Sequence, residues 1–297
     1  MPRFMPKGII PAMATPCDRW GNVNETSLRQ LVNHLIAGGV HGLFPIGSQG
    51  EFYALTTEQK KRVLEIVVDE TRGRVPVYAG TAALTTRETI ELTKIARDIG
   101  ASAVSILTPY FTNLSQRELT AYFTETAQAV PEIPVLLYAN PARAKVGLNV
   151  ETVVELAKVD NIVGVKDSTG DVTLTGEYIR ATRGMDFHVL AGRDTVIYAA
   201  LCHGATGSIA SCANVAPALM VEIYEAFQAG DHERSLAAQY RLAPLRQAFE
   251  LGTFPVVVKE ALTMMGIDAG EPVHPVLPMT DDAREKLRQV LVGMKII

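Results

Sequence analysis

A repeating unit runs through the sequence from residue 8 onward and limits the folds that the chain can adopt. Each unit has a short β-type run, a turn containing Gly, Pro, Ser or Thr, and a segment with apolar residues at three- and four-residue spacing. Strands that alternate with helices imply a parallel sheet. Eight runs are predicted as strands: Gly8–Pro16, Gly42–Gly47, Pro76–Thr81, Ala103–Pro109, Pro134–Pro141, Ile162–Lys166, Phe187–Gly192 and Ala205–Ser211.

Eight strand–helix units close most naturally into a barrel, so we predict an α/β fold, a (βα)8 TIM barrel. A doubly wound open sheet is the alternative. It is disfavoured because the first strand is not followed by a G-x-G-x-x-G turn and no Walker-type loop is present.

Helix starts are marked by side chains that can accept hydrogen bonds from free backbone amides. Such residues are Thr56 before a helix over 60–71, Thr85 before one over 89–99 and Ser115 before one over 116–129. The first helix, over 25–36, is expected to stop at the pair Gly38-Gly39, since glycine adopts the left-handed conformation that helix ends favour.

The barrel with its active site is predicted over residues 1–230, and residues 231–297 are predicted as a C-terminal helical extension. Helical patterns in this extension cover 233–250, 255–266 and 281–294. A segment of this size forms little core alone, so it should pack on the barrel or on another subunit.

Composition favours a small-molecule enzyme over a nucleic-acid or membrane protein. The 297 residues are 47% hydrophobic and 20% charged, and the formal net charge of -4 gives no basic surface for nucleic acid. No run of about 18 apolar residues is present to span a bilayer. The start, Met1–Lys7, is too short and too interrupted by proline for a secretory signal, so a cytoplasmic location is predicted.

Cysteine and histidine usage gives no sign of a disulfide framework or a metal site. Cys17, Cys202 and Cys212 are scattered and odd in number, and buried packing is their expected role. The six histidines share no metal-ligand spacing, so no metal is expected. Lys259, in an apolar helical stretch, is predicted to point outward.

Lys166 is the main candidate for chemistry. It ends an apolar strand and precedes a Ser/Thr/Gly/Asp loop, so it should emerge at the strand's carboxyl end. A desolvated ammonium has a lowered pKa, and a neutral amine can attack a carbonyl carbon to form a Schiff base. The alternative is an ordinary pair with Asp167 at the strand end.

Other chemical groups are predicted at the same end of the barrel, where active sites of this fold lie. The turn Gly47-Ser48-Gln49-Gly50 allows backbone amides to approach a small carboxylate, although a plain tight turn is equally compatible with it. Tyr138 offers a phenol on the strand next to that of Lys166, and Arg143 offers a fork suited to a carboxylate. A core-edge tyrosine and a solvated arginine are the alternatives.

Three motifs carry a family resemblance: Gly47–Glu51, Tyr138–Pro141 and Gly164–Ser168. Together they closely resemble the dihydrodipicolinate synthase and N-acetylneuraminate lyase family of pyruvate-dependent class I aldolases. The resemblance extends over the whole chain, through Thr108-Pro109-Tyr110 and Ala213–Pro217 to the helical tail.

The resemblance implies a role for each matching residue. Lys166 would form the Schiff base with pyruvate or another 2-keto acid, Tyr138 would be the general acid and base, and Ser48 would extend the proton relay. The amides of Ser48 and Gln49 would hold the substrate carboxylate. Further residues match the substrate pocket, namely Gly50, Arg143, Gly192 and Ile209, and Tyr110 and Phe111 match a part of the pocket that neighbouring subunits share.

The resemblance also implies the partners of the chain. These are a small-molecule 2-keto acid and other copies of the chain in a homotetramer built as a dimer of dimers, with no nucleic acid and no membrane. No cofactor is implied, since the covalent imine on Lys166 supplies the electron sink and no metal is needed.

Departures from the family pattern concern the substrate. Members that make dihydrodipicolinate carry two threonines in the turn and a second tyrosine after Pro-Tyr, whereas this chain has Ser48, Gln49 and Phe111. Phe111 cannot relay a proton. The favoured prediction is therefore a Schiff-base-forming lyase, an aldolase or dehydratase, acting on a 2-keto acid such as a hydroxy-oxoglutarate or a keto-deoxy sugar acid.

Two alternatives remain open. One is 4-hydroxy-tetrahydrodipicolinate synthase, which joins pyruvate to aspartate semialdehyde, because Arg143 matches the arginine used for the carboxylated aldehyde. The other is a catalytically inactive ligand-binding barrel.

Overall fold

The structure is a computed structural model that describes residues 4–297; residues 1–3, at the start of the predicted barrel, lie outside the described residues. The described strands form a seven-stranded sheet of order β1-β7-β6-β5-β4-β3-β2, in which the neighbouring pairs from β2 to β7 are parallel. Their bounds are β1 (Gly8–Pro11), β2 (Tyr78–Gly80), β3 (Ala103–Leu107), β4 (Val135–Ala139), β5 (Ile162–Asp167), β6 (His188–Ala191) and β7 (Gly207–Ala210).

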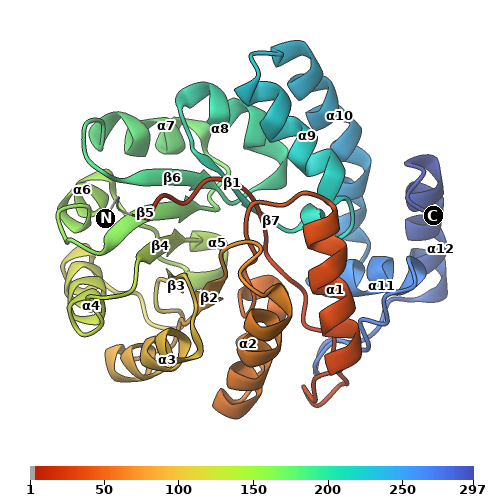
Figure 1. Cartoon of the computed structure of the whole chain (residues 1–297), viewed down its shortest axis with the longest axis horizontal. Helices are drawn as coiled ribbons and strands as arrows, with labels where there is room; N and C mark the ends of the chain where they lie inside the picture. Colours follow the sequence, from red (N-terminus) through yellow and green to blue (C-terminus); the bar gives the residue numbers. More distant parts are fainter. Residues whose placement is uncertain (1–3) are drawn as a thin grey trace. The chain divides into compact units, whose positions relative to one another are not determined.

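The chain divides into two compact units. The first unit consists of the residues up to Gly8 together with Tyr78–Ile209. Strands alternate with helices in this unit. In Figure 1, β3 to β6 lie next to one another, and α3, α4, α6 and α7 lie beside these strands. The helices are α3 (Thr86–Ile99), α4 (Gln116–Gln128), α5 (Pro141–Ala144), α6 (Val150–Leu156), α7 (Val172–Ala181) and α8 (Ile197–His203), with the short 3-10 helix η2 (Asp194–Val196).

The second unit joins Ile9–Val77 to Ala210–Ile297 and is mainly helical. Its α-helices are α1 (Glu25–Ala37), α2 (Thr57–Thr71), α9 (Pro217–Gln228), α10 (His232–Ala248), α11 (Val256–Met264) and α12 (Asp281–Gly293). Three 3-10 helices accompany them: η1 (Ser48–Gly50), η3 (Cys212–Asn214) and η4 (Phe249–Leu251). The α9 and α10 helices pack together (Figure 1), and the buried Ser235 hydroxyl donates to the Ile223 carbonyl at 2.6 Å. The division at residue 230 stays a prediction.

The capping residues identified in the sequence start the helices as expected. Thr56 and Gln59 form a reciprocal capping box at α2, Ser115 and Glu118 form another at α4, and the Thr85 side chain accepts from Glu88 at α3. Two of these helices begin three residues earlier than predicted, because the cap directly precedes the first helical residue.

The predicted second strand, 42–47, is not a regular strand in the structure. It makes isolated parallel bridges, Leu43 with Val77 and Phe44 with Ala12. The Leu43 amide donates to Pro76 at 3.0 Å and the Phe44 amide donates to Pro11 at 2.9 Å, so the segment still pairs on both sides.

The register between β4 and β5 shifts by one residue. Val135 lies opposite Ile162, but Leu136 lies opposite Gly164, and beyond the shift Tyr138 lies opposite Lys166. Gly164 also lies against β6, where an added Cβ would come within 2.3 Å of the His188 carbonyl oxygen. This position therefore requires glycine.

Within residues 4–297, no helix is both long and apolar enough to cross a bilayer.

Candidate active site

Lys166 on β5 and Tyr138 on β4 form the centre of the candidate site. They lie opposite each other in the parallel ladder, so their side chains project from the same face of the sheet. The Lys166 Nζ atom is 4.1 Å from the centre of the Tyr138 ring. Lys166 is 3% exposed and Tyr138 is 4% exposed, so the pair is held in a largely water-free environment.

Burial lowers the pKa of Lys166 below its ordinary value, because desolvation penalises the ammonium form. Two groups oppose this effect. Tyr138 acts through its charge and its hydrogen bond to the lysine, and the Asp194 carboxylate acts through its charge. Since desolvation has the largest effect, the neutral amine, which is the nucleophilic form, is more accessible at Lys166 than in a solvated lysine.

Asp167 faces away from this pair, because successive residues of a strand point to opposite faces of the sheet. Its Oδ1 accepts from the Thr169 amide at 2.9 Å and the Thr169 hydroxyl at 2.7 Å, and its Oδ2 accepts from the Thr175 hydroxyl at 2.5 Å. The alternative interpretation, in which Asp167 is the ion partner of Lys166, is therefore not supported.

The Tyr138 hydroxyl has a second neighbour at the end of β4. The Asn140 Nδ2 atom donates to the Tyr138 oxygen at 3.0 Å. On the other side of β4, the Thr108 amide donates to the Tyr138 carbonyl at 3.2 Å. The phenol oxygen is thus fixed by a neutral amide that can stabilise negative charge on it.

Gly192 and Ile209, predicted to line the pocket, follow β6 and lie on β7 respectively. The Gly192 amide donates to the Asp167 carbonyl at 2.7 Å, and its carbonyl accepts from the Ser168 hydroxyl at 3.2 Å. An added Cβ at this glycine would lie 2.0 Å from Ser168 Oγ, so packing forbids a side chain here. Ile209 is 1% exposed.

Arg143 and Phe111 lie on exposed parts of the first unit. Arg143 belongs to the short helix α5 directly after β4 and is exposed. Phe111 is 83% exposed and has a φ of 90°, a region that side-chain-bearing residues rarely adopt. The preceding Tyr110 is partly buried, and burial raises the pKa of its phenol.

Ser48, Gln49 and Gly50 belong to the second unit, where they form the 3-10 helix η1. The Thr15 hydroxyl donates to the Gly50 carbonyl at 2.9 Å. Gln49 is 1% exposed, and its Nε2 lies 3.5 Å from the Pro255 carbonyl. Among the described residues, its buried Oε1 has no hydrogen-bond donor.

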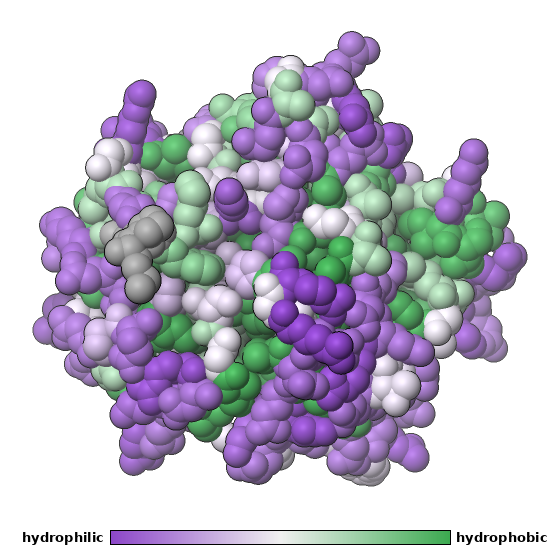
Figure 2. All heavy atoms as spheres, viewed as in Figure 1, coloured by the Kyte–Doolittle hydropathy of each residue, from purple (hydrophilic) through white to green (hydrophobic). Residues whose placement is uncertain are grey.

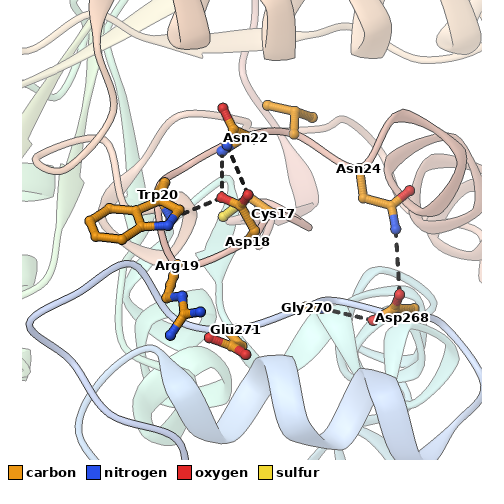
Figure 3. A pocket seen from close by; sticks show the side chains of 10 residues that line it. Cys17, Asp18, Arg19, Trp20, Asn22, Asn24, Asp268, Gly270 and Glu271 are labelled. Carbon is orange, nitrogen blue, oxygen red and sulfur yellow. Dashed lines mark hydrogen bonds between the residues drawn. The ribbon is translucent and has the colours of Figure 1, made fainter.

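A cavity of about 530 Å³ opens elsewhere in the second unit (Figure 3). None of the predicted site residues line it. The Trp20 amide and the Asn22 side chain both donate to the Asp18 carboxylate there, and the carboxylate of Asp268 faces Asn24. Its lining comprises Cys17, Asp18, Arg19, Trp20, Asn22, Val23, Asn24, Asp268, Gly270 and Glu271.

Two features of the site region were not found from the sequence. Asp194, 4% exposed, acts on Lys166 but lies 28 residues away in the chain. The only available signal was that it follows the carboxyl end of a predicted strand. Lys259 was predicted to point outward, and this is wrong: it is 1% exposed and pairs with Glu51 at 2.7 Å.

The expected burial of the three cysteines is correct for two of them. Cys17 and Cys212 are buried, but Cys202 is exposed near the end of α8, so its predicted packing role is wrong.

Comparisons with known proteins agree with the fold. A model of the Dihydrodipicolinate synthetase family matches residues 5–293. The chain is 41% identical over 296 residues to a 4-hydroxy-tetrahydrodipicolinate synthase of Methanopyrus kandleri, a match that covers 99% of this chain and 98% of the relative.

Solved structures of dihydrodipicolinate synthases have the same fold as this chain. The dihydrodipicolinate synthase of Thermotoga maritima has a TM-score of 0.94 at 29% identity, covering 98% of this chain and 99% of that one. The chloride-inhibited dihydrodipicolinate synthase of Acinetobacter baumannii, complexed with pyruvate, has a TM-score of 0.92 at 35% identity, with coverage of 98% and 99%. The predicted (βα)8 barrel is confirmed. The chain therefore belongs to the dihydrodipicolinate synthetase family, whose enzymes are class I lyases that act through a lysine Schiff base.

Proposed function

We propose that Lys166 forms a Schiff base with the keto carbon of pyruvate or another 2-keto acid, and that Tyr138 moves the protons of this reaction. The observation that carries the proposal is the buried pair itself, with the Lys166 Nζ atom 4.1 Å from the Tyr138 ring centre and the pKa of the lysine lowered by burial. A neutral amine beside a phenol is the arrangement that imine chemistry needs.

The steps follow from these two groups. The Lys166 amine adds to the keto carbon and gives one of its protons to the former carbonyl oxygen, and Tyr138 supplies the second proton with which this oxygen leaves as water. The resulting iminium accepts the electron pair released when a neighbouring C–C bond breaks or when a proton is lost to form the enamine. In a dehydration, the enamine then expels the substrate hydroxyl, which keeps the C–O electron pair and leaves as water with the proton that was removed. Asn140 donates to the Tyr138 oxygen at 3.0 Å and stabilises the phenolate that forms when Tyr138 gives up its proton.

The carboxylate of the keto acid is assigned to the turn that holds Ser48, Gln49 and Gly50. Backbone amides in a tight turn form a concavity that suits an anion. Gly192 and Ile209 are assigned to the substrate pocket beside Lys166. The chemistry needs no metal and no organic cofactor, since the iminium is itself the electron sink.

The favoured substrate is a 2-keto acid that is cleaved or dehydrated, such as a hydroxy-oxoglutarate or a keto-deoxy sugar acid. Phe111 supports this choice, because a phenyl ring cannot pass a proton to an incoming aldehyde. Gln49 supports it as well, since its buried Oε1 has no donor among the described residues and a substrate hydroxyl would supply one.

A second candidate is 4-hydroxy-tetrahydrodipicolinate synthase. Relatives that carry this name are 36% to 41% identical over nearly the whole chain. Arg143, exposed directly after β4, is suited to the carboxylate of aspartate semialdehyde.

We further propose that the chain assembles as a homotetramer and works in the cytoplasm. Phe111, 83% exposed at a positive φ, is an apolar side chain that a neighbouring copy would cover. Hydrophobic atoms also reach the visible surface around α12 in Figure 2, a helix that carries Val292 at 47% exposure.

One experiment tests the covalent step. Incubation with pyruvate and sodium borohydride should add a pyruvate-sized mass to Lys166, located by peptide mass spectrometry, and prior EDTA treatment should not change the yield. Lys166→Ala should give no adduct. Failure of the natural chain to form the adduct at saturating pyruvate would refute the Schiff-base assignment and favour an inactive ligand-binding barrel.

A substrate screen separates the two candidate reactions. Release of pyruvate from a hydroxy-oxoglutarate or a keto-deoxy sugar acid supports the favoured lyase. Consumption of pyruvate only with aspartate semialdehyde supports the synthase.

A further inference from the structure

A buried lysine outside the candidate catalytic pair, Lys259 of α11, is fully hydrogen-bonded within the second unit. Its Nζ atom donates to Glu51 Oε2 at 2.7 Å, to the Glu271 carbonyl at 2.6 Å and to Cys17 Sγ at 3.2 Å. An ammonium group has three donors, and here each has an acceptor. The cation is therefore built into the structure as a charged clamp.

Glu51 is the charged partner of this clamp and is 0% exposed. Its Oε2 pairs with Lys259, and its Oε1 accepts from the Val273 amide at 2.7 Å. The carboxylate is thus held from two directions, by helix α11 and by the loop that leads from it to α12. Each oxygen of this buried carboxylate thus has a hydrogen-bond partner within the second unit.

Glu51 directly follows the 3-10 helix Ser48–Gly50 and ends it. Its φ is 57°, a left-handed conformation that a residue with a side chain adopts at a cost, and its amide donates to the Ser48 carbonyl at 3.2 Å. Ile46, before the turn, has a φ of 59°, which is rarer still for a β-branched residue. Such conformations persist only where the surroundings enforce them.

The buried ion pair lies at the residue that ends the turn, and stability alone is a weak reason for its presence. Replacing a buried ion pair with apolar residues of similar volume is often neutral or stabilising, because both charges must be desolvated. Fixing one conformation is a role that a buried ion pair can have apart from stability.

We propose that Lys259 is a positioning residue: through Glu51 it fixes the turn 48–50 and so the backbone amides that receive the keto acid's carboxylate. This inference rests on the proposed function of that turn. The clamp contributes no group to the reaction and acts only on the geometry of the anion site.

The test measures pyruvate-dependent borohydride trapping, which separates affinity from chemistry. For each variant, the half-saturating pyruvate concentration and the limiting rate of adduct formation are determined. The variants are Lys259→Met, Glu51→Gln and the double variant. The control is Leu287→Ala, which empties a fully buried site on α12 without touching the clamp.

Both single variants should raise the half-saturating pyruvate concentration by roughly 10- to 100-fold, as expected for misplaced binding groups, with a much smaller change in the limiting rate. The double variant should regain thermal stability, since it buries no unpaired charge, but keep the weakened affinity. Leu287→Ala should lower the melting temperature and leave the half-saturating concentration unchanged. The double variant decides the question even where Lys259→Met does not fold.

Three results would overturn the inference. The first is a folded single variant with unchanged half-saturation, and the second is a double variant that regains both stability and affinity, which would make the pair purely structural. The third is absence of an adduct in the natural chain, which refutes the proposed function together with the inference, whereas the first two results leave that function intact.

Discussion

Lys166 and Tyr138 face each other across two parallel strands, with the lysine nitrogen 4.1 Å from the centre of the tyrosine ring. Both side chains are buried, so Tyr138 acts on Lys166 in a medium of low polarity. Tyr138 raises the pKa of Lys166 while burial lowers it by more.

The rate of pyruvate trapping should rise with pH around a midpoint below the ordinary pKa of lysine. Burial favours the neutral amine, so the reactive form is already populated at a lower pH than in a solvated lysine. The measurement is the initial rate of adduct formation, with cyanoborohydride as the reductant, over roughly pH 6 to 10. A midpoint near 10.4, the value of a free side chain, would contradict this expectation.

Tyr138→Phe should lower kcat by about 10²- to 10⁴-fold, because the proton carrier is lost. It should also shift the trapping midpoint to lower pH, since the hydrogen bond and charge of Tyr138 are among the influences that raise the pKa of Lys166. The matched control is Tyr178→Phe, which removes another buried phenol oxygen, one that donates to the Leu148 carbonyl. A control with the same pH shift would refute a specific role for Tyr138.

Asp194→Asn should move the same midpoint to lower pH without removing any proton donor. The Asp194 carboxylate stabilises the ammonium form of Lys166, so its neutralisation favours the free amine further. Trapping below the natural midpoint should become faster in this variant. Asp194→Glu keeps the charge and should behave like the natural chain; an unchanged profile in Asp194→Asn would refute the coupling.

Arg143→Ala should leave pyruvate trapping unchanged. It should impair only the reactions of substrates that carry a second carboxylate away from the keto group. For a substrate with a distal carboxylate, kcat/KM should fall roughly 10- to 100-fold, the usual effect of losing a hydrogen bond to a charged group. Arg117→Ala, on the exposed face of α4, serves as the control. Equal loss for substrates with and without the distal carboxylate would argue against this role.

Phe111→Ala should weaken self-association, because it removes an exposed aromatic side chain without emptying the core. An anchor of this kind typically contributes enough that its loss raises the dissociation constant by roughly tenfold or more. Sedimentation velocity over a concentration series measures the effect. Trp20→Ala, at a residue 68% exposed, is the control, and identical profiles for both variants would exclude Phe111 from an interface.

Local signals in the sequence predicted the helices and the central pair well. Thr56, Thr85 and Ser115 were identified from their chemistry, and each caps the helix that it was expected to start. Lys166 and Tyr138 were placed on neighbouring strands because consecutive β–α units of a parallel sheet lie side by side. These inferences needed only the chain on either side of the residue concerned.

Long-range pairing is what the sequence did not reveal. Lys259 lies 208 residues from Glu51. The apolar pattern of a helix shows which face is buried, but it cannot show that a carboxylate far away in the sequence pairs with a lysine on that face. The same limit applies to Asp194, whose effect on Lys166 depends on how β6 lies against β5. The apolar run 42–47 does pair with the segments on both sides of it, as predicted, but it forms only two isolated bridges, which are too few for a regular strand.

The one-residue shift between β4 and β5 determines whether the two reactive side chains can meet at all. Pairing continued regularly from Val135 and Ile162 would bring Val165 opposite Tyr138 and Lys166 opposite Ala139. The amine and the phenol would then emerge on opposite faces of the sheet, one toward each layer of the protein. The reactivity of this chain thus depends on a one-residue irregularity in the pairing of two strands. An insertion or deletion that restored a regular register would separate the amine from the phenol, although both residues would still be present in the sequence.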